Sequence, residues 1–295
     1  MSRETAPDQD RVPAAAATRS RKSARAVSLL RSRSGVTAGV ALLVVMFALS
    51  YFTGVLRPFS STEVAGIPFT GPDGTHWLGT DPVGRDYFVR LCQAGRTSLS
   101  IALLSATLAL VVGSAIGLTA GLVGRWVDSL LMSVIDLLLS FPSILLALAA
   151  VTAFSPTRKT LVIVLAVISV PHFARIVRAR CLELREREFV LSARISGVSA
   201  PVIAVKHLLP NVFPLMMVQL ANTAAIVILI ESSLSYLGLG VQAPTPSWGR
   251  MIFESQNYMA QSPWLPLAPA GALLLSSVGW GLIGEGFSTS RRSVV

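Results

Sequence analysis

Residues 189–210, FVLSARISGVSAPVIAVKHLLP, form a polar stretch rich in small residues inside a very apolar chain. Gly197 lies where a short helix would end, because glycine adopts the left-handed conformation that a helix terminus often needs. Ser199 and Pro201 follow as a start signal for a second helix, which Pro210 is expected to close. The stretch therefore predicts two short helices joined at Gly197 and exposed between two apolar spans.

The chain around this stretch has the composition of an integral membrane protein. Of its 295 residues, 52% are hydrophobic and 14% are charged, whereas a soluble domain has about 25% charged residues. The mean hydropathy is +0.64. The length of these apolar runs argues against an outer-membrane barrel, which would show short alternating strands. A helix needs about 20 apolar residues to cross a bilayer, and the stretches that qualify lie at roughly 36–56, 99–123, 130–152, 161–178, 212–232 and 266–287. The predicted fold class is all-α, a polytopic membrane protein with six transmembrane helices.

The distribution of basic residues predicts the orientation. Of the 25 lysines and arginines, 18 lie in the N-terminal tail, at Arg125, in the loop 172–211 or in the C-terminal tail. The positive-inside rule places these segments in the cytoplasm and the chain in the cytoplasmic membrane. The net charge of +10 suits an anionic lipid surface, and no nucleic-acid partner is expected. Cys92 and Cys181 fall on opposite sides of the membrane and are not expected to pair.

The sequence divides into five parts. We expect a disordered basic cytoplasmic leader at 1–34, with no cleavable signal peptide, and a first transmembrane helix at 35–57. An external segment, 58–96, leads to a five-helix core at 97–287 that contains the cytoplasmic loop 179–211. A cytoplasmic tail, 288–295, ends the chain.

Four segments in this order resemble a known family. Residues 189–210 carry Ala193, Gly197, Leu209 and Pro210 at the spacing of the EAA loop of bacterial ABC importer permeases. The other three segments are GTDPVGRD (79–86), GLVGRWVDSLLMSVIDLLLSFPSILLAL (121–148) and ESSLSYLGLGVQAPTPSWGRMI (231–252). Together they look like the C-type permease subunit of dipeptide, oligopeptide and nickel importers, of the type I ABC importer fold.

The resemblance implies which residues dock an ATPase. They belong to the EAA-type loop: Ser192, Ala193, Arg194, Gly197, Val198, Ser199, Leu209 and Pro210. Leu191 stands where the family has its glutamate, so that carboxylate is missing here. An interhelix loop without a partner is the alternative reading of the segment.

The resemblance also implies a function and partners. The chain would be the non-catalytic permease subunit of an ATP-driven importer of di- or oligopeptides that works by alternating access. Its partners would be a second homologous permease, two ATPase subunits, an extracytoplasmic solute-binding protein and membrane lipid. The three lysines follow no phosphate-binding loop, so ATP and Mg would bind the partner ATPases, with no cofactor or metal on this chain. The alternatives are import of nickel, haem, glutathione or another small solute and, in a different class, a membrane-embedded enzyme or signalling protein.

Two acidic residues inside the predicted spans have alternative roles. Asp136 either contacts the substrate path or a gate, or forms a structural pair with Arg125, a helix end or water. Glu231 either contacts substrate or caps a helix near Ser232. Pro142 either bends its span or acts as a hinge.

The external segments supply further candidates. Asp81, Arg85 and Asp86 lie just before a helix start, and Trp248 lies in a turn-rich stretch. We expect these four residues to face the binding protein, with an interfacial membrane anchor as the alternative for Trp248. Gly113, Gly117 and Gly121 share one helix face, which indicates either close helix packing or a sliding surface.

Overall fold

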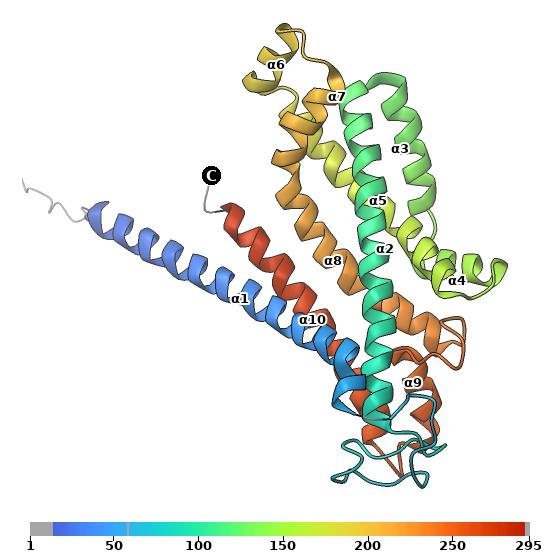
Figure 1. The fold of residues 1–295 in the computed structure, drawn as a ribbon. Coiled ribbons are helices and arrows are strands. Elements are labelled where there is room, and N and C mark those ends of the chain that lie inside the picture. Colours follow the sequence, from blue (N-terminus) through green and yellow to red (C-terminus); the bar gives the residue numbers. More distant parts are fainter. Residues whose placement is uncertain (1–13, 58, 293–295) are drawn as a thin grey trace, which may run out of the picture.

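The computed structural model describes residues 14–57 and 59–292, and in this part of the chain regular structure is helical apart from one isolated bridge between Thr80 and Asp86. The predicted all-α class is confirmed. Long helices run side by side between two ends of the molecule (Figure 1). We call the end with α6 and α7 the elbow end, and the end with α9 and the segment 57–86 the loop end (Figure 1).

The first and last helices form an antiparallel pair. Helix α1 spans Ala14–Leu56 and α10 spans Trp264–Arg292. The two helices approach so closely at Gly39 that a Cβ added there would lie 2.6 Å from the carbonyl oxygen of Gly279. Residues 14–34 of the predicted leader continue α1; this stretch is rich in alanine and arginine, which favour helix. The remainder of that leader lies outside the described residues.

Helices α2 (Tyr87–Val123) and α5 (Arg158–Leu184) form the centre of the bundle. Cβ atoms added at Gly113, Gly117 and Gly121 would each come within 2.7 Å of α5 atoms. The stripe therefore packs the two helices backbone to backbone, which confirms the packing interpretation. Helix α2 begins well before the predicted 97, because Asp86 caps it by accepting from the backbone N–H of Val89 (2.9 Å).

The third predicted span, 130–152, is two helices rather than one. Helix α3 (Arg125–Leu139) and α4 (Ser143–Ala153) meet at 87°. Pro142 lacks an N–H and its ring obstructs the carbonyl four residues earlier, so the helix ends and restarts there. The bend expected at Pro142 is therefore a full break.

The polar stretch 189–210 begins after α5 and leads into α8. It contains α6 (Glu188–Ile195), α7 (Ala200–Val202) and a π-helical turn, Ile203–Leu208, that leads directly into α8 (Leu209–Tyr236). After α8 the chain turns back at the loop end through α9 (Trp248–Ser255) and a short 3₁₀ turn, Gln256–Tyr258. Pro210 therefore does not close a helix. The wider π turn before it separates the proline ring from the preceding carbonyls, and the helix continues.

Five single helical segments are long and apolar enough to cross a membrane, and the bent pair α3–α4 makes a sixth if it is one span. The side chain of Arg158, at the start of α5, donates to the Ser100 hydroxyl at 2.6 Å. Residues 125–157 therefore cover the length of α2 from Gly124 back to Ser100, which is about 36 Å. The pair thus connects the two ends of the bundle.

Candidate functional site

Gly197 is the pivot between α6 and α7. Its φ is +77°, in the left-handed region. Its N–H donates to the carbonyl of Arg194, and the N–H of Val198 donates to that of Ala193, both at 3.0 Å. This is the hydrogen-bond pattern of a Schellman motif, which satisfies the last carbonyls of α6. The predicted turn at Gly197 is confirmed, and Ser199 occupies the N-cap position of α7 as expected, although its side chain makes no capping bond.

The inner face of the elbow, which we define as residues 188–202, is anchored in a small apolar core. Val190 is fully buried, as are Leu208 and Val212 of the following helix. They pack with Val177 and Cys181 of α5 in one cluster. Because a buried aliphatic side chain contributes about 1.5–3 kcal/mol, this cluster holds the elbow in a fixed position on the bundle.

The outer face of the elbow leaves apolar side chains in contact with solvent. Phe189 and Leu191 are 42% and 44% exposed, and Ile195 is 88% exposed. Ser192 and Arg194 are exposed beside them. Leu191, at the position of the family glutamate, is therefore part of this exposed apolar surface. The surface belongs to α6, which projects from the elbow end (Figure 1).

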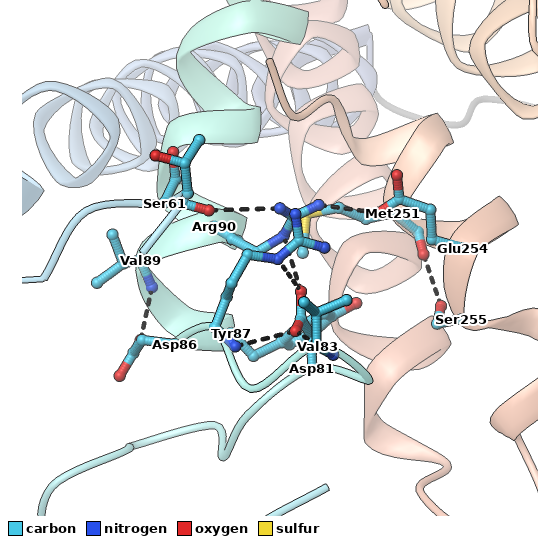
Figure 2. A network of polar contacts seen from close by, with 12 residues as sticks. Ser61, Asp81, Val83, Asp86, Tyr87, Val89, Arg90, Met251, Glu254 and Ser255 are labelled. Carbon is cyan, nitrogen blue, oxygen red and sulfur yellow. Dashed lines mark hydrogen bonds and ion pairs between the residues drawn. The ribbon is translucent and has the colours of Figure 1, made fainter. Parts of the chain in front are cut away.

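At the loop end, buried Asp81 and Arg90 and half-buried Glu254 form a charge network that joins three segments (Figure 2). The Arg90 guanidinium lies 3.4 Å from Asp81 and 2.8 Å from Glu254, and it also donates to the carbonyl of Ser61 at 3.3 Å. Asp81 additionally binds Arg85 at 2.6 Å. Arg90 and Asp81 are each only 2% exposed. The network fastens the external segment and α9 to the start of α2.

Asp86 forms a second buried contact beside this network. Its carboxylate lies 2.8 Å from His76 Nδ1 and 3.7 Å from the Arg57 guanidinium. A turn at Asp73 holds His76, because the backbone N–H groups of His76 and Thr75 both donate to the Asp73 carboxylate. These hydrogen bonds, first the one from His76, keep the pKa of Asp73 below its usual value. The expectation that Asp81 and Asp86 face a binding protein is wrong, because both are buried; Arg85 alone of the three retains partial exposure.

Trp248 is also buried, at 2% exposure, and is neither a docking residue nor an interfacial anchor. Its indole N–H donates to the carbonyl of Leu91 at 3.0 Å, and its backbone N–H donates to the Ser98 hydroxyl at 3.3 Å. The ring lies so close to Gly95 that a Cβ there would come within 2.9 Å of it. Trp248 therefore locks α9 against α2, and a turn-rich sequence gave no signal of this contact.

We expect Trp248→Phe to lower the stability of the protein by about 1–3 kcal/mol, from the lost hydrogen bond and the smaller ring. The measurement is the thermal unfolding of the purified complex. Trp77→Phe is the control, because Trp77 is 50% exposed at the same end of the molecule. Equal stability of the two variants would contradict the core role of Trp248.

Glu231 is fully buried near the end of α8. It accepts hydrogen bonds from the hydroxyls of Ser235 (2.7 Å) and Ser232 (3.4 Å). The hydroxyls of Ser98 and Ser247 also lie against it. Both expected roles, substrate contact and helix cap, are wrong, because this carboxylate is enclosed by serines from three helical segments.

The other acidic candidate, Asp136, lies on an exposed surface of α3 and α5. We define the polar face as the two ion pairs of this surface, Asp136–Arg175 and Asp128–Arg178. The Asp136 carboxylate accepts from Arg175 at 2.6 Å, and the two side chains are 60% and 54% exposed. About two turns closer to the elbow end on α3, Asp128 pairs with Arg178 of α5. The expected pairing with Arg125 is wrong, because α5 presents its own arginines to α3.

This polar face continues into a small cavity between α4, α5 and α8, with an accessible volume of about 90 Å³. Its polar lining comes from Ser143, Ser169, His172, Gln219 and Thr223. His172 and Arg175 are three residues apart and share a helix face. Arg175 and Glu254 could not be identified as site residues from composition alone, although the i, i+4 spacing of Arg250 and Glu254 was a detectable signal.

Comparison with known proteins assigns this fold to a family. Residues 113–283 match the family described as binding-protein-dependent transport system inner membrane component. The matched part holds the elbow, the polar face and the buried Glu231. The matched range begins after the Asp81–Arg90 network.

Individual relatives match over most of the chain. The dipeptide transport system permease protein DppC of Alkalihalophilus pseudofirmus is 36% identical over 249 residues, which cover 84% of this chain and 82% of the relative. The glutathione transport system permease protein GsiD of Pectobacterium atrosepticum is 33% identical, covering 87% and 86%. A putative peptide permease protein of Brucella suis is 35% identical, with the same coverage of 87% and 86%.

The fold is also found among solved structures. A chain of the MetNI methionine ABC transporter, solved in inward-facing conformations, superposes with a TM-score of 0.56 and 17% identity and covers 70% of this chain and 96% of that chain. At this identity the match concerns the fold alone. The predicted family is confirmed: the chain belongs to the binding-protein-dependent transport system inner membrane components, and it is a multi-pass, non-catalytic permease subunit of an ABC importer.

Proposed function

We propose that this permease imports peptides, with dipeptides as the first candidates. The observation that carries the proposal is the 36% identity to a dipeptide permease over 84% of the chain. A glutathione permease at 33% identity makes this tripeptide thiol the second candidate. Both solutes carry peptide bonds and terminal charges, for which a path with exposed charged groups is suited.

The elbow is our proposed ATPase docking site. It presents a rigid, partly apolar surface, with Ile195 at its most exposed point. ATP and Mg would bind the two partner ATPases, and their closure would move the elbow and, through α5 and α8, the whole bundle. Alternating access then needs only a small shift between two packed states.

The polar face is our proposed substrate path, formed against a second permease chain. Charged side chains inside a membrane normally face protein or water, not lipid. The Asp136–Arg175 pair is more than half exposed in the single chain, so an additional surface must cover it. A homologous permease packed there would enclose Asp136, Arg175 and the cavity at His172 in an aqueous path.

We infer that both termini and the elbow face the cytoplasm. Six crossings and the excess of basic residues at the elbow end support this orientation. A binding protein would then meet the loop end through exposed residues such as Ile67, Trp77 and Val83, which replace the buried candidates. A single cysteine at Asp73 should react with an impermeant reagent from outside, and reaction at Ser290 would contradict the orientation.

Uptake in a strain that lacks its own peptide permeases tests the substrate. We expect the chain, expressed with its cognate partners, to restore uptake of labelled dipeptides. Unlabelled glutathione in tenfold excess distinguishes the two candidates, because strong competition by glutathione alone would favour the second. Loss of uptake in a strain without the ATPases is the control for a primary, ATP-driven process.

A further inference from the structure

A polar cavity of about 370 Å³ opens at the loop end, where α1, α2 and α5 meet. Its lining includes Ser50, Tyr51, Arg96, Thr97, Arg158 and Thr245. Among the residues that the structure describes, no carboxylate lines it, so its charge comes from two guanidinium groups. A cavity with two arginines and several hydroxyls is suited to an anion.

Both arginines are held in place by neighbouring side chains. The Arg96 guanidinium lies 4.8 Å from the centre of the Tyr51 ring, in a cation–π contact. Arg158 donates to the Ser100 hydroxyl at 2.6 Å. Each guanidinium has five N–H donors, so these contacts leave donors available for a ligand.

An apolar groove of about 520 Å³ lies against the same tyrosine. Tyr51 lines both spaces, and the groove is further lined by Val40, Val44, Phe47, Leu103 and Trp280. From Tyr51 to Val40 the helix rises about 16 Å, close to the half-thickness of about 15 Å of a bilayer's hydrocarbon core. The groove therefore follows α1 through the depth of one leaflet.

The polar cavity also lies at the correct depth for a headgroup. Arg96 is the last charged residue before the apolar run of α2, and Arg158 and Lys159 begin α5. Tyr51 is five residues from the end of α1 at Leu56. Helices α2 and α5 therefore change from polar to apolar at this level, as helices do at a membrane–water boundary.

We propose that the two spaces together bind one phospholipid of the leaflet at the loop end. The phosphate lies between Arg96 and Arg158, and one acyl chain fills the groove along α1. Two positive charges with no acidic neighbour in the lining favour an anionic lipid, such as phosphatidylglycerol, over a zwitterionic one. The lipid bridges α1 to the bundle.

The test is lipid retention by the complete, purified transporter, measured by native mass spectrometry after transfer from phosphatidylglycerol nanodiscs into detergent. We expect one tightly retained phosphatidylglycerol per copy of this chain. Arg96→Gln and Arg158→Gln should each weaken retention about tenfold. Lys159→Gln removes the same charge from the next residue, which does not line the cavity, and should retain the lipid. Equal losses in all three variants would overturn the proposal.

The groove is tested without a change in charge. Ala48→Trp should fill it and release the lipid as effectively as Arg96→Gln, whereas Leu49→Trp, at an exposed position outside the groove, should not. All variants are compared as assembled complexes with normal ATPase activity, so that a folding defect is recognised. Retention in Ala48→Trp would contradict the acyl-chain site.

Inorganic phosphate distinguishes a lipid from a free anion. We expect phosphate at about 50 mM, an ionic strength at which the Debye length is still about 10 Å, to leave the retained lipid in place. Displacement of the lipid by phosphate, or Arg96-dependent binding of phosphate without any retained lipid, would assign the cavity to a free anion and overturn the lipid proposal.

Discussion

Replacing Gly197 by proline will abolish substrate uptake while leaving the chain inserted in the membrane. Proline fixes φ near −65° and has no N–H, whereas Gly197 has a φ of +77° and donates to the carbonyl of Arg194. The turn between α6 and α7 cannot form, so α6 and its exposed apolar surface lose their fixed orientation relative to the bundle. Insertion depends on the long apolar helices and is expected to continue.

A series of substitutions at this position separates backbone conformation from bulk. No atom lies within 4 Å of a Cβ added at Gly197, so size alone is tolerated. We expect Gly197→Asn to retain most uptake, because asparagine adopts the left-handed region at low cost. Uptake by Gly197→Ala should lie between those of the asparagine and proline variants, because alanine in the left-handed region costs about 1–2 kcal/mol of conformational free energy. Uptake and ATPase co-purification are measured for each variant. Normal uptake by the proline variant would refute the docking role of the elbow.

Replacing Arg90 by leucine will destabilise the loop end by about 3 kcal/mol, the lower part of the range for breaking a buried ion pair. The guanidinium touches Asp81, Glu254 and the carbonyl of Ser61, and it is 2% exposed (Figure 2). Leucine leaves the buried Asp81 with Arg85 as its remaining cationic partner. The expected loss of stability lies at the low end of the range because two ion pairs survive, Asp81 with Arg85 and Glu254 with Arg250.

The matched control for this variant is Arg250→Leu. Arg250 also binds Glu254, at 2.7 Å, but its side chain is 26% exposed, and an exposed pair contributes about 0–1 kcal/mol. Thermal unfolding of the purified complex compares the two variants. We expect Arg90→Lys to fall between them, because lysine keeps the charge but lacks the planar fork that reaches several acceptors at once. Equal unfolding of the two leucine variants would contradict the role of the network.

Local sequence was sufficient to predict the elbow. Gly197 lies at a helix end because this position itself takes a positive φ, and this requirement is set by the backbone within a few residues. The apolar spans and the close-packing stripe at Gly113, Gly117 and Gly121 are likewise encoded by composition and period. Helix ends were less well predicted, because α1 and α2 continue beyond their apolar cores.

The roles of the polar candidates at the loop end could not be predicted from the same information. Asp81, Asp86 and Trp248 lie in polar, turn-rich stretches that are usually exposed, yet their partners lie on other segments, among them Arg90, His76 and Leu91. A buried charge or indole is stable only when such a partner exists. Burial at these positions is therefore a property of the assembled bundle.

The sequence by itself determined that the chain is a polytopic helical permease with a glycine-centred elbow, because hydropathy, helix period and turn preference act over short distances. Only the tertiary structure decided that Glu231 is enclosed by serines and that Asp136 pairs with Arg175. These features depend on which helix faces which. That choice is made by packing between residues 39 to 150 positions apart in the chain, where no local preference operates.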